Sequence, residues 1–215
     1  MKKIYAVRKG KKTGLFETWE ECSQSVTGFP GAEYKGFSSK EEAMEYLDAG
    51  EKNKQAESAN RLQVYVDGSY SEELQKYAFG CVFLMPSGII CTQYGNGNNP
   101  QSLKHRNVTG EMLGAMYAVK TAMYNGYEGV ELYYDYEGIE KWVTGAWKAR
   151  TEYTIKYSEA MREWGKSIRI SFVKVPAHSN VEYNEMADKT AKKGLTEGDG
   201  IPPIMKLEEL PLWNL

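Results

Sequence analysis

Four carboxylates occupy sequence positions from which they could act together. Asp67 and Asp135 each end a stretch with the apolar pattern of a buried strand. Glu111 lies in the first turn of a predicted amphipathic helix, and Asp188 lies in the last predicted helix. A carboxylate beside apolar residues is partly desolvated, which is costly unless a cation is near. If the four converged, they would raise each other's pKa unless divalent metal ions neutralised them.

The chemistry that such a cluster supports is phosphodiester hydrolysis. Carboxylate oxygens without Cys or His suit Mg²⁺ or Mn²⁺, and two such ions about 3.5–4 Å apart promote in-line displacement at phosphorus. Each residue also has an ordinary structural interpretation. Asp67 can belong to a turn and Glu111 can complement a helix dipole. Asp135 can terminate a strand, and Asp188 can pair with Lys192 four residues later. Spacing alone does not bring the four together.

The elements that would position these carboxylates lie between residues 62 and 195. Alternation of apolar and polar residues predicts strands, and a repeat of 3.6 residues predicts helices. The predicted strands cover residues 62–66, 77–85, 89–94, 130–134 and 168–175, and the predicted helices cover residues 109–125, 137–147, 151–164 and 180–194. Three consecutive strands followed by helices that alternate with strands predict an α/β fold, with a mixed sheet and helices on its faces.

Residues 1–47 predict a separate small α+β module of ββαβα order. Strands are expected at residues 4–7, 15–16 and 34–37. The first helix would be capped by Thr18, and a second would begin after Ser39. Six basic residues precede the first acidic residue, Glu17. This basic end favours a module that binds a polyanion, although a solvated lysine surface is the simpler interpretation.

Composition excludes several classes of protein. The 215 residues carry a formal net charge of -2 and are 41% hydrophobic, as is usual for a globular protein. An apolar run of the roughly 20 residues that a membrane span requires is missing from the sequence. The basic start is not followed by the apolar stretch of a signal peptide. Three cysteines without a close pair favour reduced thiols, so we expect a cytoplasmic location.

Two further segments connect or follow these modules. Residues 48–61 contain no large apolar residue and predict a flexible linker. Residues 196–215 form a tail with two apolar, proline-containing stretches. The tail could pack back on its domain, dock a partner, or be disordered.

The four carboxylates stand in motifs that resemble those of type I ribonuclease H. The motifs occur in the family's order within residues 62–195. They are Tyr65-Val66-Asp67-Gly68-Ser69, Gly110-Glu111, Tyr133-Tyr134-Asp135-Tyr136-Glu137-Gly138-Ile139, Val175-Pro176-Ala177-His178-Ser179 and Asn184-Glu185-Met186-Ala187-Asp188. The resemblance implies a mixed five-stranded sheet flanked by helices. It also implies two bound Mg²⁺ ions, for which Mn²⁺ can substitute.

The same resemblance implies roles for individual residues. Asp67 would bridge both ions, and Asp188 would complete the ion that activates water. Glu111 and Asp135 would hold the ion on the leaving-oxygen side. Glu111 would also touch the RNA 2′-hydroxyl.

Other family positions would assist or would touch nucleic acid. His178 would assist proton transfer or product release. The backbone of Gly68 and Ser69 would face the RNA strand, and Asn107 matches a position that contacts nucleic acid.

Residues 1–47 resemble the hybrid-binding domain, also called viroplasmin-like, that often precedes this enzyme. The matching stretches are Tyr5-Ala6-Val7-Arg8-Lys9-Gly10, Gly14-Leu15-Phe16, Thr18-Trp19-Glu20-Glu21-Cys22, Phe29-Pro30-Gly31-Ala32 and Tyr34-Lys35-Gly36-Phe37. Trp19 and Tyr34 correspond to aromatics that stack on DNA sugars, and Lys35 to a lysine that meets phosphate. Trp19 could instead be a core residue. Gly36 replaces a residue that is commonly basic or polar in the family, which predicts weaker phosphate binding.

The expected activity is endonucleolytic hydrolysis of the RNA strand of RNA–DNA hybrids, leaving 5′-phosphate and 3′-hydroxyl ends. The expected partner is the hybrid, with double-stranded RNA a further candidate for the small module. No membrane partner is expected, and the oligomeric state stays open. One alternative is a catalytically silent protein that binds hybrids or double-stranded RNA. Another is an integrase-like DNA strand-transfer enzyme, a group that lacks this N-terminal module.

Overall fold

The computed structural model describes residues 3–48, 60–176 and 181–213, and the chain divides into two compact units, Met1–Ala59 and Asn60–Leu215. The predicted linker covers residues 48–61, and most of it lies outside the described residues. The unit boundary falls inside that predicted linker.

The first unit is a small sheet with two helices, in the predicted ββαβα order. Its elements are β1 (Ile4–Lys9), β2 (Gly14–Phe16), α1 (Trp19–Val26), β3 (Glu33–Phe37) and a helix over residues 40–48. The strands are antiparallel in the order β2-β1-β3. A short core consists of Val7, Cys22 and Val26.

Local contacts explain why these short helices form. The Thr18 side chain caps α1 by accepting a hydrogen bond from the Glu21 N–H at 3.3 Å. The Ser39 hydroxyl accepts one from the Glu42 N–H at 3.1 Å. The Arg8 guanidinium donates to the Tyr46 carbonyl and lies 3.6 Å from the centre of the Tyr46 ring. This contact ties the second helix to β1.

The second unit contains the expected mixed sheet. In the described part of the chain its strands are β4 (Arg61–Ser71), β5 (Lys76–Leu84), β6 (Ile90–Gly97), β7 (Gly129–Tyr134) and β8 (Arg169–Lys174). Their order is β6-β5-β4-β7-β8. The first three strands pair antiparallel, whereas β7 pairs parallel with β4 and with β8. The parallel pairing brings the residues after β7 to the same edge as the middle of β4.

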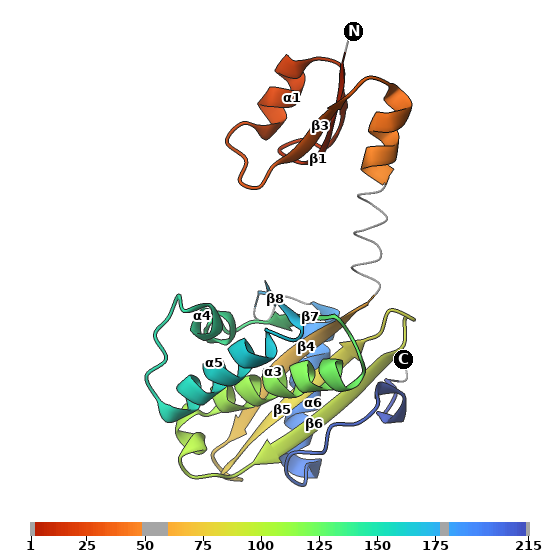
Figure 1. Cartoon of the computed structure of the whole chain (residues 1–215). Coiled ribbons are helices and arrows are strands. Elements are labelled where there is room, and N and C mark those ends of the chain that lie inside the picture. The colour runs from red at the N-terminus through yellow and green to blue at the C-terminus, as the bar shows by residue number, and fades with distance from the viewer. Residues whose placement is uncertain (1–2, 49–59, 177–180, 214–215) are drawn as a thin grey trace. The chain divides into compact units, whose positions relative to one another are not determined.

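Helices cover both faces of this sheet (Figure 1). Helices α3 (Asn107–Tyr124), α4 (Gly138–Thr144) and α5 (Glu152–Trp164) contribute to the large core on one face, together with Leu62, Val64 and Val66. Helix α6 (Glu182–Glu197) lies on the other face, where Met186 and Ala187 pack against Val82. The described part of this unit also contains the short 3₁₀ helices η1 (Ser102–His105) and η2 (Leu207–Glu209).

Two boundaries near the carboxylates differ from the predicted ones. Strand β4 continues to Ser71, so Asp67 lies within a strand and not at its end. The strand continues because its hairpin with β5 extends to that residue, while its pairing with β7 stops at Tyr65. Helix α3 begins at Asn107, two residues before the predicted start, which places Glu111 in the second turn and not the first.

The tail packs on the second unit, at least as far as residue 213. Leu207 and Leu210 are buried in the large core. Residue Leu212 bridges to Cys91 of β6, and the Trp213 N–H donates to the Ile90 carbonyl at 3.0 Å. These bonds cover part of the exposed edge of β6, which would otherwise present unpaired backbone groups.

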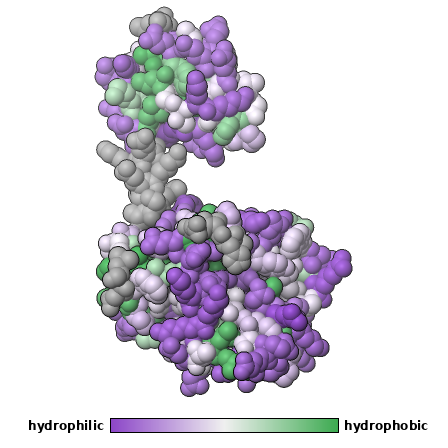
Figure 2. Space-filling view, turned by 180° about the vertical axis from the view of Figure 1, so that it is seen from behind, coloured by the Kyte–Doolittle hydropathy of each residue, from purple (hydrophilic) through white to green (hydrophobic). Residues whose placement is uncertain are grey.

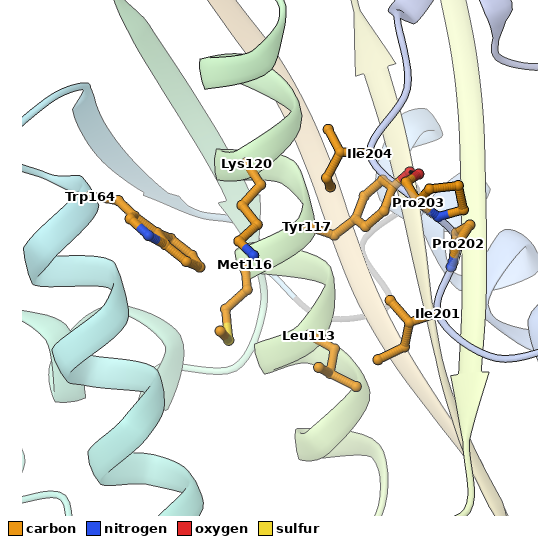
Figure 3. Close-up of a pocket in the computed structure, with 9 residues that line it drawn as sticks. All are labelled: Leu113, Met116, Tyr117, Lys120, Trp164, Ile201, Pro202, Pro203 and Ile204. Atoms are coloured by element: carbon orange, nitrogen blue, oxygen red, sulfur yellow. Dashed lines mark hydrogen bonds between the residues drawn. The ribbon is translucent and has the colours of Figure 1, made fainter.

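An apolar pocket lies where the tail runs along α3 (Figure 3). The Tyr117 hydroxyl donates to the Pro203 carbonyl at 2.9 Å and fixes the tail on this side of the helix. The pocket is lined by Leu113, Met116, Tyr117, Lys120, Trp164, Ile201, Pro202, Pro203 and Ile204. None of the four carboxylates is among these residues, so the pocket is not the candidate site.

None of the helices in the described part of the chain combines the length and the apolar character that crossing a membrane requires. The face of the second unit seen in Figure 2 is covered largely by hydrophilic side chains.

Candidate active site

Three of the four carboxylates meet at one place in the second unit. Asp67 comes from β4, Glu111 from α3, and Asp135 directly follows β7. One carboxylate oxygen from each lies within 4.8 Å of the others. The three elements are far apart in sequence, and the parallel pairing of β4 with β7 brings two of them to one edge.

Two glycines allow Glu111 to approach Asp67. A Cβ atom on Gly68 would lie 2.1 Å from the Asn107 carbonyl oxygen and 2.5 Å from the Glu111 backbone nitrogen. A Cβ atom on Gly110 would lie 2.0 Å from the Ala78 carbonyl oxygen. Any larger residue at either position would separate α3 from the sheet. The close packing therefore sets Glu111 beside Asp67.

Burial and mutual repulsion disfavour the ionised forms of the carboxylates in this cluster. Glu111 is 2% exposed, and burial, followed by the charges of Asp135 and Asp67, raises its pKa well above the usual value. Burial and Asp135 also raise the pKa of Asp67 to about 7, although the Gly68 N–H donates to its Oδ1 at 2.7 Å and acts in the opposite direction. The folded protein therefore resists full ionisation of the cluster at neutral pH.

Within the three carboxylates, one buried oxygen has no hydrogen-bond partner among the described residues. It is Glu111 Oε2, whereas Oε1 accepts a hydrogen bond from Asn107 Nδ2 at 3.4 Å. A buried carboxylate oxygen without a partner is costly. A bound cation would satisfy it and would neutralise the repulsion at the same time. The donor set consists of carboxylate oxygens, which fits Mg²⁺ or Mn²⁺.

Asp188 lies beside this group but outside it. Among the residues that the structure describes, the group with ligand atoms within 4.8 Å contains Asp67, Glu111 and Asp135 but not Asp188. The Asp188 side chain is 36% exposed, and its Oδ2 accepts from Lys192 Nζ at 2.7 Å. Its charge nevertheless contributes to the raised pKa of Asp67. The i+4 pairing with Lys192 is thus present, and the carboxylate also acts on the cluster.

A third glycine positions the helix that carries Asp188. Asp67 pairs across the sheet with Gly80 of β5. A Cβ atom on Gly80 would lie 2.3 Å from the Ala187 carbonyl oxygen and 2.4 Å from the Ala191 nitrogen of α6. Helix α6 therefore packs against the backbone next to Asp67. This contact explains how a residue from the end of the fold influences the cluster.

The remaining residues predicted for this site are His178, Asn107, Gly68 and Ser69, and the structure describes all of them except His178. Asn107 is the first residue of α3 and contacts Glu111 directly. Gly68 packs against the start of α3, and Ser69 follows it as a half-buried residue of β4. Gly110 appeared in a predicted motif without a packing role, and Gly80 was missed, because a close approach between distant segments leaves no local signal beyond the glycine itself.

In the first unit, Trp19 and Tyr34 form an exposed aromatic surface with Tyr5. Trp19 is 46% exposed and Tyr34 is 44% exposed, so Trp19 is not simply a core residue. The Trp19 ring lies 5.8 Å from that of Tyr34 and 5.4 Å from that of Tyr5, measured between centroids. Lys35 follows Tyr34 on β3, and strand alternation directs it to the opposite face, with Nζ 5.5 Å from the Phe37 ring centre.

Comparison with known proteins links each unit to a family. Residues 3–47 match the family model described as the ribonuclease H1 N-terminal domain, and residues 59–196 match the RNase H family model. Ribonuclease H1 of Homo sapiens is 26% identical over 259 aligned positions, which cover 91% of this chain and 90% of the relative. Ribonuclease H of Saccharomyces cerevisiae is 54% identical over 44 positions, which cover 20% of this chain and 13% of the relative.

Solved structures agree with the fold of the second unit. RNase H1 from Halobacterium salinarum NRC-1 has a TM-score of 0.53 and 25% identity, covering 63% of this chain and 97% of that one. LC11-RNase H1 in complex with an RNA/DNA hybrid has a TM-score of 0.50 and 16% identity, covering 63% and 99%. At the latter identity the likeness supports the fold alone. Since the RNase H family model covers well over half of the chain, this protein belongs to the ribonuclease H family of enzymes.

Proposed function

We propose that this chain hydrolyses the RNA strand of RNA–DNA hybrids endonucleolytically, with two divalent ions, leaving 5′-phosphate and 3′-hydroxyl ends. The observation that carries the proposal is the strained group of Asp67, Glu111 and Asp135, with one buried oxygen unpartnered among the described residues. Membership of the ribonuclease H family supports the reaction, and a structural neighbour that was crystallised with an RNA/DNA hybrid is consistent with the substrate.

Each carboxylate would bind one or both of the metal ions. Asp67, whose pKa is raised by the charges of both Asp135 and Asp188, would contact both ions, Mg²⁺ or, in substitution, Mn²⁺. Glu111 and Asp135 would hold the ion on the leaving-oxygen side, and Asp188 would complete the other. When bound, the two ions supply an activated water and neutralise charge on the leaving oxygen. The Asn107 amide restrains the Glu111 carboxylate, so this ligand would be held in place before the ions bind.

Other residues of the second unit would serve substrate binding and proton transfer. The Glu111 carboxylate would also recognise the RNA 2′-hydroxyl. The backbone of Gly68 and Ser69 would face the RNA strand, and exposed Asn107 would contact nucleic acid. His178 would assist proton transfer or product release.

The first unit would hold the hybrid. The exposed rings of Trp19 and Tyr34, joined by Tyr5, offer apolar faces to sugars. Lys35, on the opposite face of β3, would offer a charge to phosphate. Binding through such a charge favours a polyanion and is sensitive to salt. The residue range of this domain, 1–47, and the linker role of residues 48–61 belong to the same proposal. The linker would raise the effective concentration of substrate at the catalytic unit.

A gel assay tests the proposal against its alternatives. Labelled RNA–DNA hybrid, double-stranded RNA and double-stranded DNA are incubated with the full chain and Mg²⁺, Mn²⁺ or a chelator. We expect cleavage of the RNA strand of the hybrid with either ion and none with the chelator. Binding without cleavage would indicate a silent binding protein, and cutting or joining of the DNA duplex would indicate an integrase-like enzyme.

A further inference from the structure

Lys192 brings a positive charge to the edge of the carboxylate group. Its Nζ lies 2.7 Å from Asp188 Oδ2, one helical turn away on α6. The same ammonium lowers the pKa of Asp67, and its own pKa is raised by Asp188 first and by Asp67 and Glu185 after it. Lys192 therefore acts on Asp188 by direct contact and on Asp67 through space.

The contact between Lys192 and Asp188 occupies one of the two carboxylate oxygens that Asp188 could offer to a metal ion. Asp188 lies outside the three-carboxylate group of the described residues, and the oxygen nearest to Lys192 is already accepting a hydrogen bond. Two cations on one carboxylate repel each other, so an ion at Asp188 and the ammonium at this distance disfavour one another. The Lys192 side chain is 63% exposed, and its flexible stem can leave Asp188 by rotation into solvent.

We propose that Lys192 is a resident counter-ion of Asp188, a positioning residue that holds this carboxylate before metal binds and competes with the incoming divalent ion. The inference rests on the proposed metal-dependent function. Its consequence is that the ion on the Asp188 side binds more weakly, and exchanges more readily, than the carboxylates alone would allow.

Calorimetric titration of the full chain with Mg²⁺, after removal of metal by a chelator, tests the proposal. Lys192→Met should tighten ion binding roughly two- to fivefold, the range that the small energies of exposed ion pairs imply. Lys192→Arg keeps the charge and should restore an affinity near that of the unchanged chain. Lys193→Met is the matched control, because Lys193 pairs with Glu197 at 3.5 Å and lies 5.6 Å from the Tyr94 ring centre.

The same Lys192 substitution in a chain that also carries Asp188→Asn distinguishes direct contact with Asp188 from a longer-range effect of the lysine charge. If Lys192 acts through Asp188, Lys192→Met should change ion affinity little when Asp188→Asn is also present. Thermal unfolding adds a reading that does not depend on cleavage: Mg²⁺ should raise the Tm of the Lys192→Met variant more than that of the unchanged chain.

The outcomes distinguish this inference from the function on which it rests. Unchanged affinity in the Lys192→Met variant, an equal gain in the Lys193→Met control, or a gain that persists with Asp188→Asn would overturn the role of Lys192, while the metal-dependent function would stand. Failure of the unchanged chain to take up Mg²⁺ or Mn²⁺ would overturn both.

Discussion

The three carboxylates of the second unit, Asp67, Glu111 and Asp135, and the aromatic surface of the first unit place their side chains in opposite environments, one buried and one exposed. Glu111 is 2% exposed and is held by backbone packing at Gly68 and Gly110. Trp19 and Tyr34 are nearly half exposed on a unit with a very small core. Charges that act on a reacting phosphate gain strength from desolvation, whereas a surface that grips a long polyanion must remain open. Repulsion between buried charges is therefore concentrated in the second unit, and exposed aromatic side chains are concentrated in the first.

The sharpest test of this contrast removes one charge from the buried group. Asp67→Asn should lower cleavage of a labelled hybrid on the order of a thousandfold or more, since metal ions contribute several kcal/mol to such reactions. Hybrid binding, measured by fluorescence anisotropy, should change little, because the aromatic surface lies in the other unit. The exposed Asp199→Asn is the control for loss of a carboxylate. Full activity in the Asp67→Asn variant would disprove the assignment.

A second test uses the raised pKa of Asp67. Because the pKa of Asp67 is raised to about 7 in the folded protein, the folded state retains a proton that the unfolded chain releases near the ordinary aspartate pKa of 3.8. The associated stability is fully present below pH 3.8 and is lost as pH rises through about 7. Chemical unfolding of the metal-free chain should therefore show stability falling across this window.

Two comparisons check the origin of that pH dependence. The slope should shrink with Asp67→Asn, because the titrating group is gone. It should also shrink in Mg²⁺, because a bound cation favours the ionised carboxylate. A slope that is the same in all three samples would show that other groups cause it.

A third test addresses the packing that assembles the group. Gly110 and Gly114 lie one turn apart on α3, and alanine favours a helix over glycine by about 1 kcal/mol at either position. A Cβ atom at position 110 would lie 2.0 Å from the Ala78 carbonyl oxygen, whereas at position 114 its nearest neighbour is the Phe79 Cβ at 3.4 Å. Gly110→Ala should lower the free energy of unfolding by about 1–3 kcal/mol and reduce cleavage.

Gly114→Ala serves as the matched control in the same helix. Its stability should be unchanged or slightly higher, with cleavage retained. Equal effects of the two substitutions, measured by denaturant unfolding, would show that the approach of α3 to the sheet does not depend on the absence of a side chain at position 110.

The smallest expected effect concerns the exposed surface. Trp19→Ala should weaken hybrid binding on the order of tenfold, the scale of losing one aromatic stacking contact. Cleavage at saturating hybrid should remain. The control is Tyr124→Ala, which removes a 55% exposed ring from the second unit. If anisotropy titrations show the same affinity for both variants, the aromatic surface does not bind the hybrid.

Sequence patterns predicted the elements well where local interactions decide them. Thr18 caps α1 as expected, and the five strands predicted for the second unit form a mixed sheet. The predictions were wrong or left open where partners are distant. Strand β4 continues beyond its apolar residues because β5 pairs with it as far as Ser71. The tail was left open between packing, docking and disorder, and it packs because Leu207 and Leu210 reach the large core.

The sequence by itself determined which residues could do chemistry, since residue type and motif order singled out Asp67, Glu111, Asp135 and Asp188. Only the tertiary structure decided which of them meet. Asp67, Glu111 and Asp135 converge, while Asp188 stands beside them in contact with Lys192. The physical reason is that convergence depends on backbone contacts between segments far apart in the chain, made possible by glycines, and a periodic local pattern does not encode those contacts.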